Sequence, residues 1–185
     1  MPPVFRTELA CRIDLERRFP NLRYSGWQRK SPLNEDYNCF AWAACDDRKL
    51  WAPLLPPYYW PPAAPRDLTV ECFVETFQGM GYKPCDDSSF EFGFQKVAVY
   101  ADEDMIPTHM ARQHFFGRGW LSKLGNLEDI LHPELKNVEG DIAATSTDYG
   151  TVVQILKRNW WAAARYGLFR GWWAAFRFLA YRLTH

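Results

Sequence analysis

The 185 residues are enough for one domain with a sizeable hydrophobic core and too few for two ordinary domains. With 48% hydrophobic and 24% charged residues, the composition is that of a globular protein and excludes a disordered chain. The net charge of zero hides an asymmetry. Six of the 22 basic residues and no acidic ones lie from Lys157 onward, so residues 1–156 hold 16 basic against 22 acidic residues, a net charge of −6. An acidic body repels phosphate backbones, so we expect no nucleic-acid binding by the main domain.

The first residues, MPPVFRTELACRIDLERRF, lack the apolar core of a secretory signal. The five cysteines (Cys11, Cys39, Cys45, Cys72 and Cys85) are an odd number, widely spaced and without a CxxC pair, which argues against a disulfide framework. We therefore expect a cytoplasmic protein. No phosphate-cradling glycine motif and no HExxH occurs, and the spacing of Cys39 and Cys45 fits no common zinc site, so neither a cofactor nor a metal is expected.

Hydrophobic spacing predicts a first helix over residues 7–19, with Leu9, Ile13, Leu15 and Phe19 facing inward. A second helix is expected to begin at Cys39, where Asn38 is a favourable N-cap before CFAWAA. Six prolines in residues 51–66 exclude a helix or a central strand there. That aromatic loop either covers an edge of the core or lines a groove, and packing is the more common role.

Asp67 is the expected N-cap of a third helix, which carries apolar residues at helical spacing and ends at the glycines 79 and 81. Beyond it the period changes to two, which predicts strands over residues 95–101, 107–113, 119–125 and 149–156. Helices followed by an antiparallel meander indicate an α+β domain rather than an alternating α/β domain.

Two residues are candidates for nucleophilic catalysis. Cys39 should occupy the first position of its helix, where free N–H groups favour a thiolate and can bind an oxyanion. His109 lies on the second expected strand, from which its imidazole could reach the helix start. Each residue alone is more often a packing residue, and only their combination in this order favours catalysis.

The elements YNCFAWA, THMARQ and GWLSKLG, in this order, resemble the papain-like cysteine peptidase fold in its NlpC-like and CHAP-like amidohydrolase form. They are also similar to a family of uncharacterised bacterial proteins with NCxAWA, THxAR and WxSKLG patterns. The resemblance covers about residues 20–156 and implies N-terminal helices packed on an antiparallel sheet. It also implies that Cys39 is the nucleophile, that His109 is the general base, and that a polar residue on the next strand orients the histidine.

At this third position the chain departs from the family, because GWLSKLG contains no Asp, Asn or His. Ser122 is the best-placed polar residue and Lys123 the next, while Glu128 and His132 lie beyond the strand. Gln28 is the one candidate for the oxyanion donor of the family. The expected function is a thiol-dependent hydrolase or acyl-transferase acting on a peptide or amide bond. The alternative is a non-catalytic module of the same fold that binds a membrane or a protein.

The expected domain spans residues 1–157, and residues 158–185 form a separate C-terminal segment rich in tryptophan and arginine. Residues 159–183 favour a helix, and Ala163, Gly167, Gly171 and Ala175 align as a ridge of small residues. Three alternatives remain for this helix: docking on its own domain or on a twin subunit, lying in a membrane interface, or spanning a bilayer, which its arginines make costly. The partners expected from the sequence are thus a peptide or amide substrate and a protein, membrane surface or second copy at the C-terminal helix, as in a peripheral membrane protein.

Overall fold

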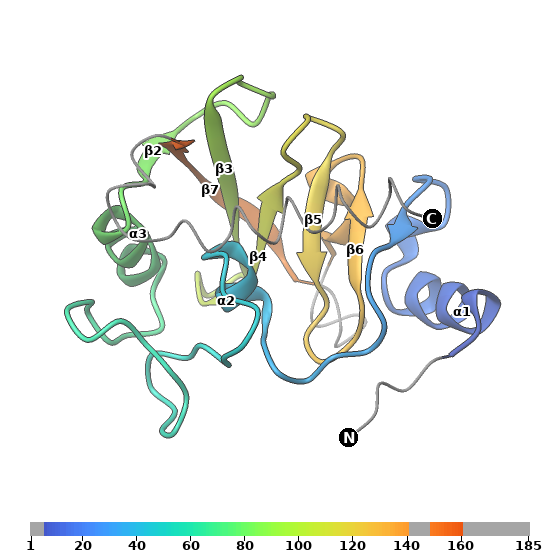
Figure 1. Cartoon of the computed structure of the whole chain (residues 1–185), viewed down its shortest axis with the longest axis horizontal. Coiled ribbons are helices and arrows are strands. Elements are labelled where there is room, and N and C mark those ends of the chain that lie inside the picture. The colour runs from blue at the N-terminus through green and yellow to red at the C-terminus, as the bar shows by residue number, and fades with distance from the viewer. Residues whose placement is uncertain (1–5, 141–148, 161–185) are drawn as a thin grey trace, which may run out of the picture.

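The computed structural model describes residues 6–140 and 149–160. In this part of the chain a seven-stranded sheet is antiparallel at every neighbouring pair, in the order β1-β6-β5-β4-β3-β7-β2 (Figure 1). The strands are β1 (Gln28–Arg29), β2 (Lys83–Cys85), β3 (Phe94–Ala101), β4 (Pro107–Gln113), β5 (Trp120–Lys123), β6 (Asp129–His132) and β7 (Thr151–Asn159). The helices are α1 (Glu8–Arg18), α2 (Cys39–Ala43) and α3 (Val70–Gly79), with the 3-10 turns η1 (Pro20–Leu22) and η2 (Leu135–Val138).

The expectation of an α+β, papain-like (NlpC-like) domain with N-terminal helices packed on a sheet is wrong. The described chain is mostly the antiparallel sheet, and its three α-helices have only 11, 5 and 10 residues. The sequence pattern missed β1, β2 and β6, which extend the sheet at both ends. β1 and β2, with two and three residues, are too short to show a period of two, and β6 (DILH) has its two apolar residues side by side instead of alternating, so no local signal marked them.

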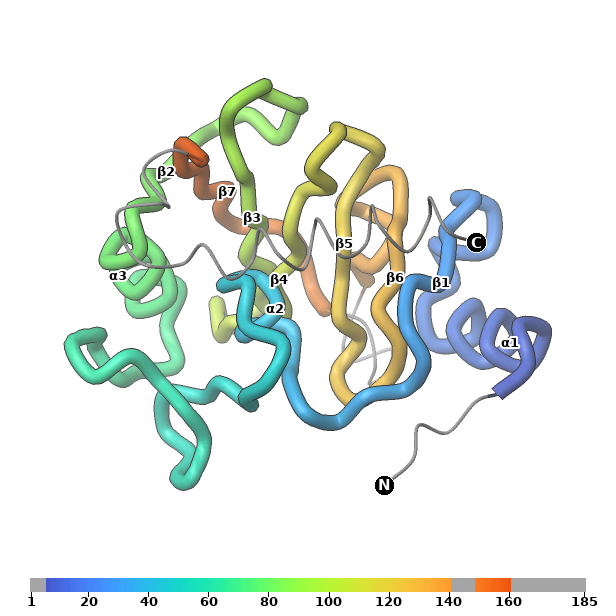
Figure 2. The backbone as a smooth tube through the Cα atoms, viewed as in Figure 1, coloured from blue at the N-terminus to red at the C-terminus, as the bar shows by residue number. Residues whose placement is uncertain are grey.

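The two faces of the sheet carry separate hydrophobic clusters. Val97 and Val99 of β3 belong to a cluster that includes α2 and α3 residues, whereas Ala98 and Tyr100 belong to a cluster with α1. Because successive side chains of a strand point to opposite faces, α2 and α3 cover one face and α1 packs against the other. We call these the α2/α3 face and the α1 face. Figure 2 shows how the chain passes from α1 along β6 as β1 before it runs to α2.

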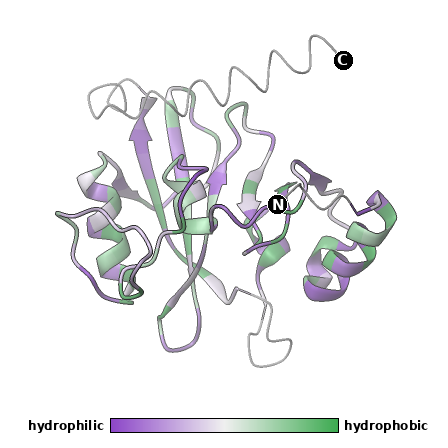
Figure 3. Cartoon of the chain, turned by 60° about the horizontal axis from the view of Figure 1, so that its bottom comes forward, coloured by the Kyte–Doolittle hydropathy of each residue, from purple (hydrophilic) through white to green (hydrophobic). Residues whose placement is uncertain are grey.

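Helix α1 forms where expected, and two of the four residues predicted to face inward, Leu15 and Phe19, are buried. Leu9 and Ile13 are 68% and 62% exposed, while Cys11 and Leu15 are fully buried and Phe19 is nearly so. Buried positions four residues apart lie on one side of a helix, and the small thiol of Cys11 completes that side. The remaining surface of α1 carries arginine–carboxylate pairs and includes the hydrophilic stretches coloured in Figure 3.

Helix α2 begins at Cys39 with Asn38 as its N-cap, as predicted. The Asn38 Oδ1 atom accepts hydrogen bonds from the N–H groups of Ala41 and Trp51, and its Nδ2 donates to the Trp51 carbonyl. These bonds join the helix start to the proline-rich loop. That loop covers the edge of the α2/α3 cluster, because Trp51 and Trp60 are buried in it.

The predicted third helix and four strands are all present, with shifted boundaries. The N-cap of α3 is Thr69 rather than Asp67. The last strand, β7, continues to Asn159, so the predicted domain boundary after residue 157 falls inside it. The predicted C-terminal helix lies, from residue 161 onward, outside the described residues. Within the described ranges, no helix is long and apolar enough to cross a membrane.

Candidate functional site

Cys39 lies at the first position of α2 and is 6% exposed. Burial raises the pKa of its thiol to about 11, although N–H groups of Met110, Phe40 and Cys39 itself, and the charge of Lys123, all favour the thiolate. The N–H groups thus surround the sulfur as expected, but desolvation outweighs them. The resting group is a neutral thiol, not the thiolate that the helix start predicts.

His109 is fully buried on β4 and belongs to a chain of three polar side chains from neighbouring strands. Its Nε2 lies 3.0 Å from the Ser122 Oγ of β5, which lies 2.8 Å from the Nε2 of His132 on β6. The Nδ1 of His132 lies 2.8 Å from the carbonyl oxygen of Glu134. We call His109, Ser122 and His132 the relay.

The positions of the protons in the relay follow from the hydrogen bond between His132 and the Glu134 carbonyl. Burial lowers the pKa of His132 to about 4, and burial with His132 nearby lowers that of His109 well below its usual range, so both rings are neutral. A carbonyl only accepts, so the His132 Nδ1 carries the proton and its Nε2 accepts from the Ser122 hydroxyl. The Ser122 oxygen then accepts from the His109 Nε2–H. The remaining nitrogen, Nδ1 of His109, is therefore an unprotonated base.

That nitrogen has no hydrogen-bond partner in the described part of the chain, although it is buried. Since Nε2 bonds to Ser122, the expected hydrogen bond between Cys39 and His109 is not formed in this structure. The ring of Tyr149 stacks on His109 with centroids 4.0 Å apart, and the Tyr100 ring contacts it edge-on. The histidine is thus held rigidly with one basic nitrogen left over.

Helix α2, which carries Cys39, and the side chain of His109 lie on different faces of β4. Met110, whose N–H contacts the Cys39 sulfur, belongs to the α2/α3 cluster, whereas the preceding His109 packs on Tyr100 of the α1 face. The body of α2 and the imidazole are therefore on opposite faces of the sheet. The thiol itself, however, lies against the peptide that follows His109.

This peptide lies beyond the end of the β4–β5 ladder, whose last register pair is Ala111 and Ser122. The N–H of His114 donates to the Gly119 carbonyl on the β5 side of the same hairpin. In a strand, the N–H groups of every second residue point to the same neighbouring strand. The N–H of Met110, four residues earlier, therefore also points toward β5. The Cys39 sulfur therefore takes the place of a missing ladder partner, in the opening where β4 and β5 separate.

Of the other predicted candidates, only Lys123 acts on the residues of this site. Lys123 is fully buried and donates to the carbonyls of Asn34 and Leu127, and its charge acts on Cys39 rather than on the relay. Glu128 forms a two-pronged ion pair with Arg6 at 2.7 Å and has no part in the site. Gln28 is exposed on β1, where its side chain accepts from Lys30, so it is not the oxyanion donor.

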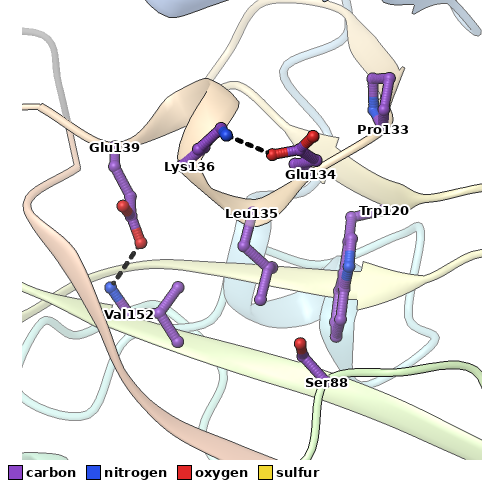
Figure 4. A pocket seen from close by; sticks show the side chains of 8 residues that line it. All are labelled: Ser88, Trp120, Pro133, Glu134, Leu135, Lys136, Glu139 and Val152. Carbon is purple, nitrogen blue, oxygen red and sulfur yellow. Dashed lines mark hydrogen bonds and ion pairs between the residues drawn. The ribbon is translucent and has the colours of Figure 1, made fainter.

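A pocket of about 440 Å³ lies at the far end of the relay (Figure 4). Its lining residues are Ser88, Trp120, Pro133, Glu134, Leu135, Lys136, Glu139 and Val152. Glu134, whose carbonyl accepts from His132, joins this lining to the relay. Neither Cys39 nor His109 lines this pocket.

Sequence reasoning named Ser122 and kept His132 as a fallback, but it missed Tyr149 and the link through both histidines. No local pattern could reveal them, because the relay depends on the register of β4, β5 and β6. In residues 6–140 and 149–160, no group of three or more His, Cys, Asp or Glu side chains is arranged to hold a metal ion.

No curated protein and no solved structure matches the chain. One family model does match, over residues 28–157, which include α2, the whole relay and most of β7. It describes a domain of unknown function, and on this match the chain belongs to the DUF7689 family.

Proposed function

We propose that this protein is a thiol-dependent hydrolase or acyl-transferase that acts on a peptide or amide bond, with Cys39 as the nucleophile and His109 as the general base. The observation that carries the proposal is the buried Nδ1 of His109, which has no hydrogen-bond partner among the described residues, while Nε2 of the same ring bonds to Ser122. The chain of hydrogen bonds that ends at the Glu134 carbonyl assigns the proton to Nε2 and leaves Nδ1 as a base. This base belongs to the residue before Met110, whose N–H contacts the Cys39 sulfur, so neighbouring positions of the chain hold the two groups that cysteine catalysis needs.

The proposed reaction begins from a neutral pair rather than a preformed ion pair. As the Cys39 sulfur bonds to the substrate carbonyl carbon, its proton moves to Nδ1 of His109. The carbonyl oxygen becomes an oxyanion, for which the N–H groups of Cys39 and Phe40 are available donors. The His109 imidazolium then gives its proton to the leaving amine, and water or another acceptor releases the acyl group from the sulfur.

The relay supports this role because it keeps the proton of His109 on Nε2. Ser122 accepts that proton's hydrogen bond, and His132 in turn accepts from Ser122. The low pKa of His109 keeps Nδ1 unprotonated throughout the neutral pH range. Because Ser122 and two tyrosine rings hold the imidazole in place, the direct contact of thiol and imidazole requires that the Cys39 side chain moves when substrate binds.

Acylation by an activated ester tests the proposal. The full chain carrying Cys45→Ser, which removes the thiol at the other end of α2, is treated with p-nitrophenyl acetate, and the acetyl group is located by peptide mass spectrometry. We expect acetylation at Cys39, and we expect His109→Gln to slow it by about a hundredfold, the usual contribution of a general base. Cys39→Ser keeps a polar acceptor for the Met110 N–H and serves as the folded control.

An acetyl group found at other residues, with an unmodified Cys39, would remove the proposal. Full burial of His109 and the 6% exposure of Cys39 favour a second candidate, a non-catalytic binding module in which the relay only stabilises the sheet. In that case His109→Gln would lower the free energy of unfolding but leave the rate of ester cleavage unchanged.

A further inference from the structure

A second cysteine lies just beyond the other end of α2, in a polar site. The Cys45 sulfur lies 3.0 Å from Nη1 of Arg112 on β4 and 3.7 Å from Nη2 of Arg158 on β7. The Nε2 of Gln95, on β3 between these strands, lies 3.5 Å from the same sulfur. Three adjacent strands thus direct polar side chains to one thiol on the α2/α3 face.

The charges at this site are unbalanced. Arg158 is 4% exposed, and within residues 6–140 and 149–160 neither Arg158 nor Arg112 pairs with a carboxylate. Their guanidinium groups bond instead to backbone carbonyls, to Gln95 and to the rings of Trp42 and Tyr82. A buried cation without an anion is costly, and the sulfur is the group here that can supply the negative charge.

The ionisation of the thiol follows this arrangement. Burial opposes the thiolate, but Arg112 and Arg158 outweigh it and lower the pKa of Cys45, with help from the hydrogen bond of Gln95. Tyr82 also interacts electrostatically with this cysteine, but burial raises the pKa of its hydroxyl, so it stays neutral. As a residue, Cys45 is partly exposed, although its thiol is desolvated.

We propose that Cys45 is an oxidation site, at which a hydroperoxide converts the sulfur to a sulfenic acid. The thiolate attacks the terminal oxygen of the hydroperoxide, a new S–O bond forms and the O–O bond breaks. The sulfur loses two electrons, the hydroxyl group stays on it, and the alkoxide or hydroxide leaves and takes a proton from water. Arg112, 3.0 Å from the sulfur, stabilises the negative charge as it passes to the leaving oxygen.

Arg158 provides a second argument for a ligand at this site. Its Nε–H is buried and has no acceptor among the described residues, while Nη2 of the same planar group faces the sulfur. An oxygen bonded to the sulfur adds an acceptor beside this guanidinium. The site is therefore better satisfied after oxidation than before it.

Trapping of the sulfenic acid tests the proposal on the full chain. The protein is treated with one equivalent of hydrogen peroxide and with dimedone, and the adducts are located by peptide mass spectrometry. We expect Cys45 to carry the adduct at least about tenfold more than Cys85, the other partly exposed cysteine. An adduct distributed equally over both, or absent from Cys45, would overturn the proposal.

Two variants separate the role of the arginines from a general loss of structure. Arg158→Gln should slow adduct formation at Cys45 by about tenfold, whereas Arg118→Gln, on the exposed β4–β5 turn, should leave it unchanged. Thermal unfolding verifies that each variant folds. Because the labelled residue is Cys45 and not Cys39, the result is independent of the hydrolase proposal. An unchanged rate in a folded Arg158→Gln variant would also overturn the proposal.

Discussion

The two ends of α2 place two cysteines in opposite electrostatic environments, although only five residues separate them. Cys39 is surrounded by N–H groups and neutral rings, and burial raises the pKa of its thiol to about 11. Cys45 is also desolvated, but two guanidinium groups contact it and lower its pKa. Two guanidinium groups at 3.0 and 3.7 Å from the sulfur therefore overcome desolvation at Cys45, whereas peptide N–H groups together with the charge of Lys123 do not at Cys39.

The two regions also differ in what they can do at rest. The Cys39 region holds neutral groups whose protons are positioned by a relay, so its chemistry requires proton transfer at the moment of attack. In the Cys45 region, charges that are present before any reagent arrives favour the thiolate and lower the pKa of the thiol. The first arrangement suits acyl transfer with a general base, and the second suits direct attack on a small electrophile.

The largest expected difference between the regions is their response to acid. In the folded state the pKa of His132 is about 4, against an ordinary value of 6.5. As the pH falls, His132 is therefore protonated in the unfolded chain before it is protonated in the folded protein, which favours unfolding. The stability from the relay is complete above pH 6.5 and is lost between pH 6.5 and about 4. A shift of this size corresponds to about 3 kcal/mol.

Urea unfolding at pH 7 and pH 4.5 measures this loss. His132→Gln should have a smaller acid dependence, because His109 is then the one histidine of the relay that takes up a proton on unfolding, while His114→Gln, at a half-buried position outside the relay, should keep most of it. The Cys45 region should contribute little to the difference, because arginines do not titrate in this range. An acid dependence that His132→Gln leaves unchanged would contradict the neutral, buried relay.

The next largest difference is the rate of alkylation of the two cysteines. Cys45 should react faster, although the position of Cys39 at the helix start predicted that Cys39 would be the thiolate. Because the pKa of Cys39 is about 11 and that of Cys45 lies below the ordinary thiol value of 9.0, Cys45 should hold at least about a hundredfold more thiolate at pH 7. A short pulse of iodoacetamide, read by peptide mass spectrometry, should label Cys45 first. Faster labelling of Cys39 would reverse the comparison.

Helix caps and apolar periodicity in the sequence predicted most of the helices and the longer strands. Asn38 before Cys39 predicted the start of α2, and the change of period predicted β3, β4, β5 and β7. The fold class was nevertheless wrong, because the short strands β1, β2 and β6 have no periodic signal and the sheet is completed by pairing between distant segments.

For the candidate site too, local sequence predicted some residues, whereas contacts between distant segments determine the others. Residue types and order predicted Cys39, His109 and Ser122, but the protonation of the relay depends on where the chain places His132 and the Glu134 carbonyl. The Cys45 site was missed because Arg112 and Arg158 are 67 and 113 residues away in the sequence. A cysteine with no nearby motif shows its reactivity only through such distant partners.

The cap of α2 gives a smaller effect that separates its two ends. Asn38→Ala removes the cap and the two bonds to Trp51, and it should lower the free energy of unfolding by about 1–2 kcal/mol. The effect should be local, because Cys45 is held by strand residues and Cys39 by the helix start. Labelling of Cys39 should therefore rise more than labelling of Cys45. Asn38→Ser, which keeps a cap oxygen, should recover part of the loss, and equal changes at both cysteines would contradict a local effect.

The smallest effect is a test of the charge balance at Cys45. The Oε1 of Gln95 accepts from Nη2 of Arg158 and from the Tyr82 hydroxyl, both at 2.9 Å. Gln95→Glu places a carboxylate at this position with almost no change in shape, so Arg158 gains an anion other than the sulfur. The pKa of Cys45 should rise, and its alkylation at pH 7 should slow by about three- to tenfold, because Arg112 still contacts the sulfur. Gln78→Glu adds the same charge on the exposed side of α3 and should leave the rate unchanged. If Gln95→Glu labels as fast as the native chain while Arg158→Gln labels slowly, Arg158 acts on the thiol through position rather than charge.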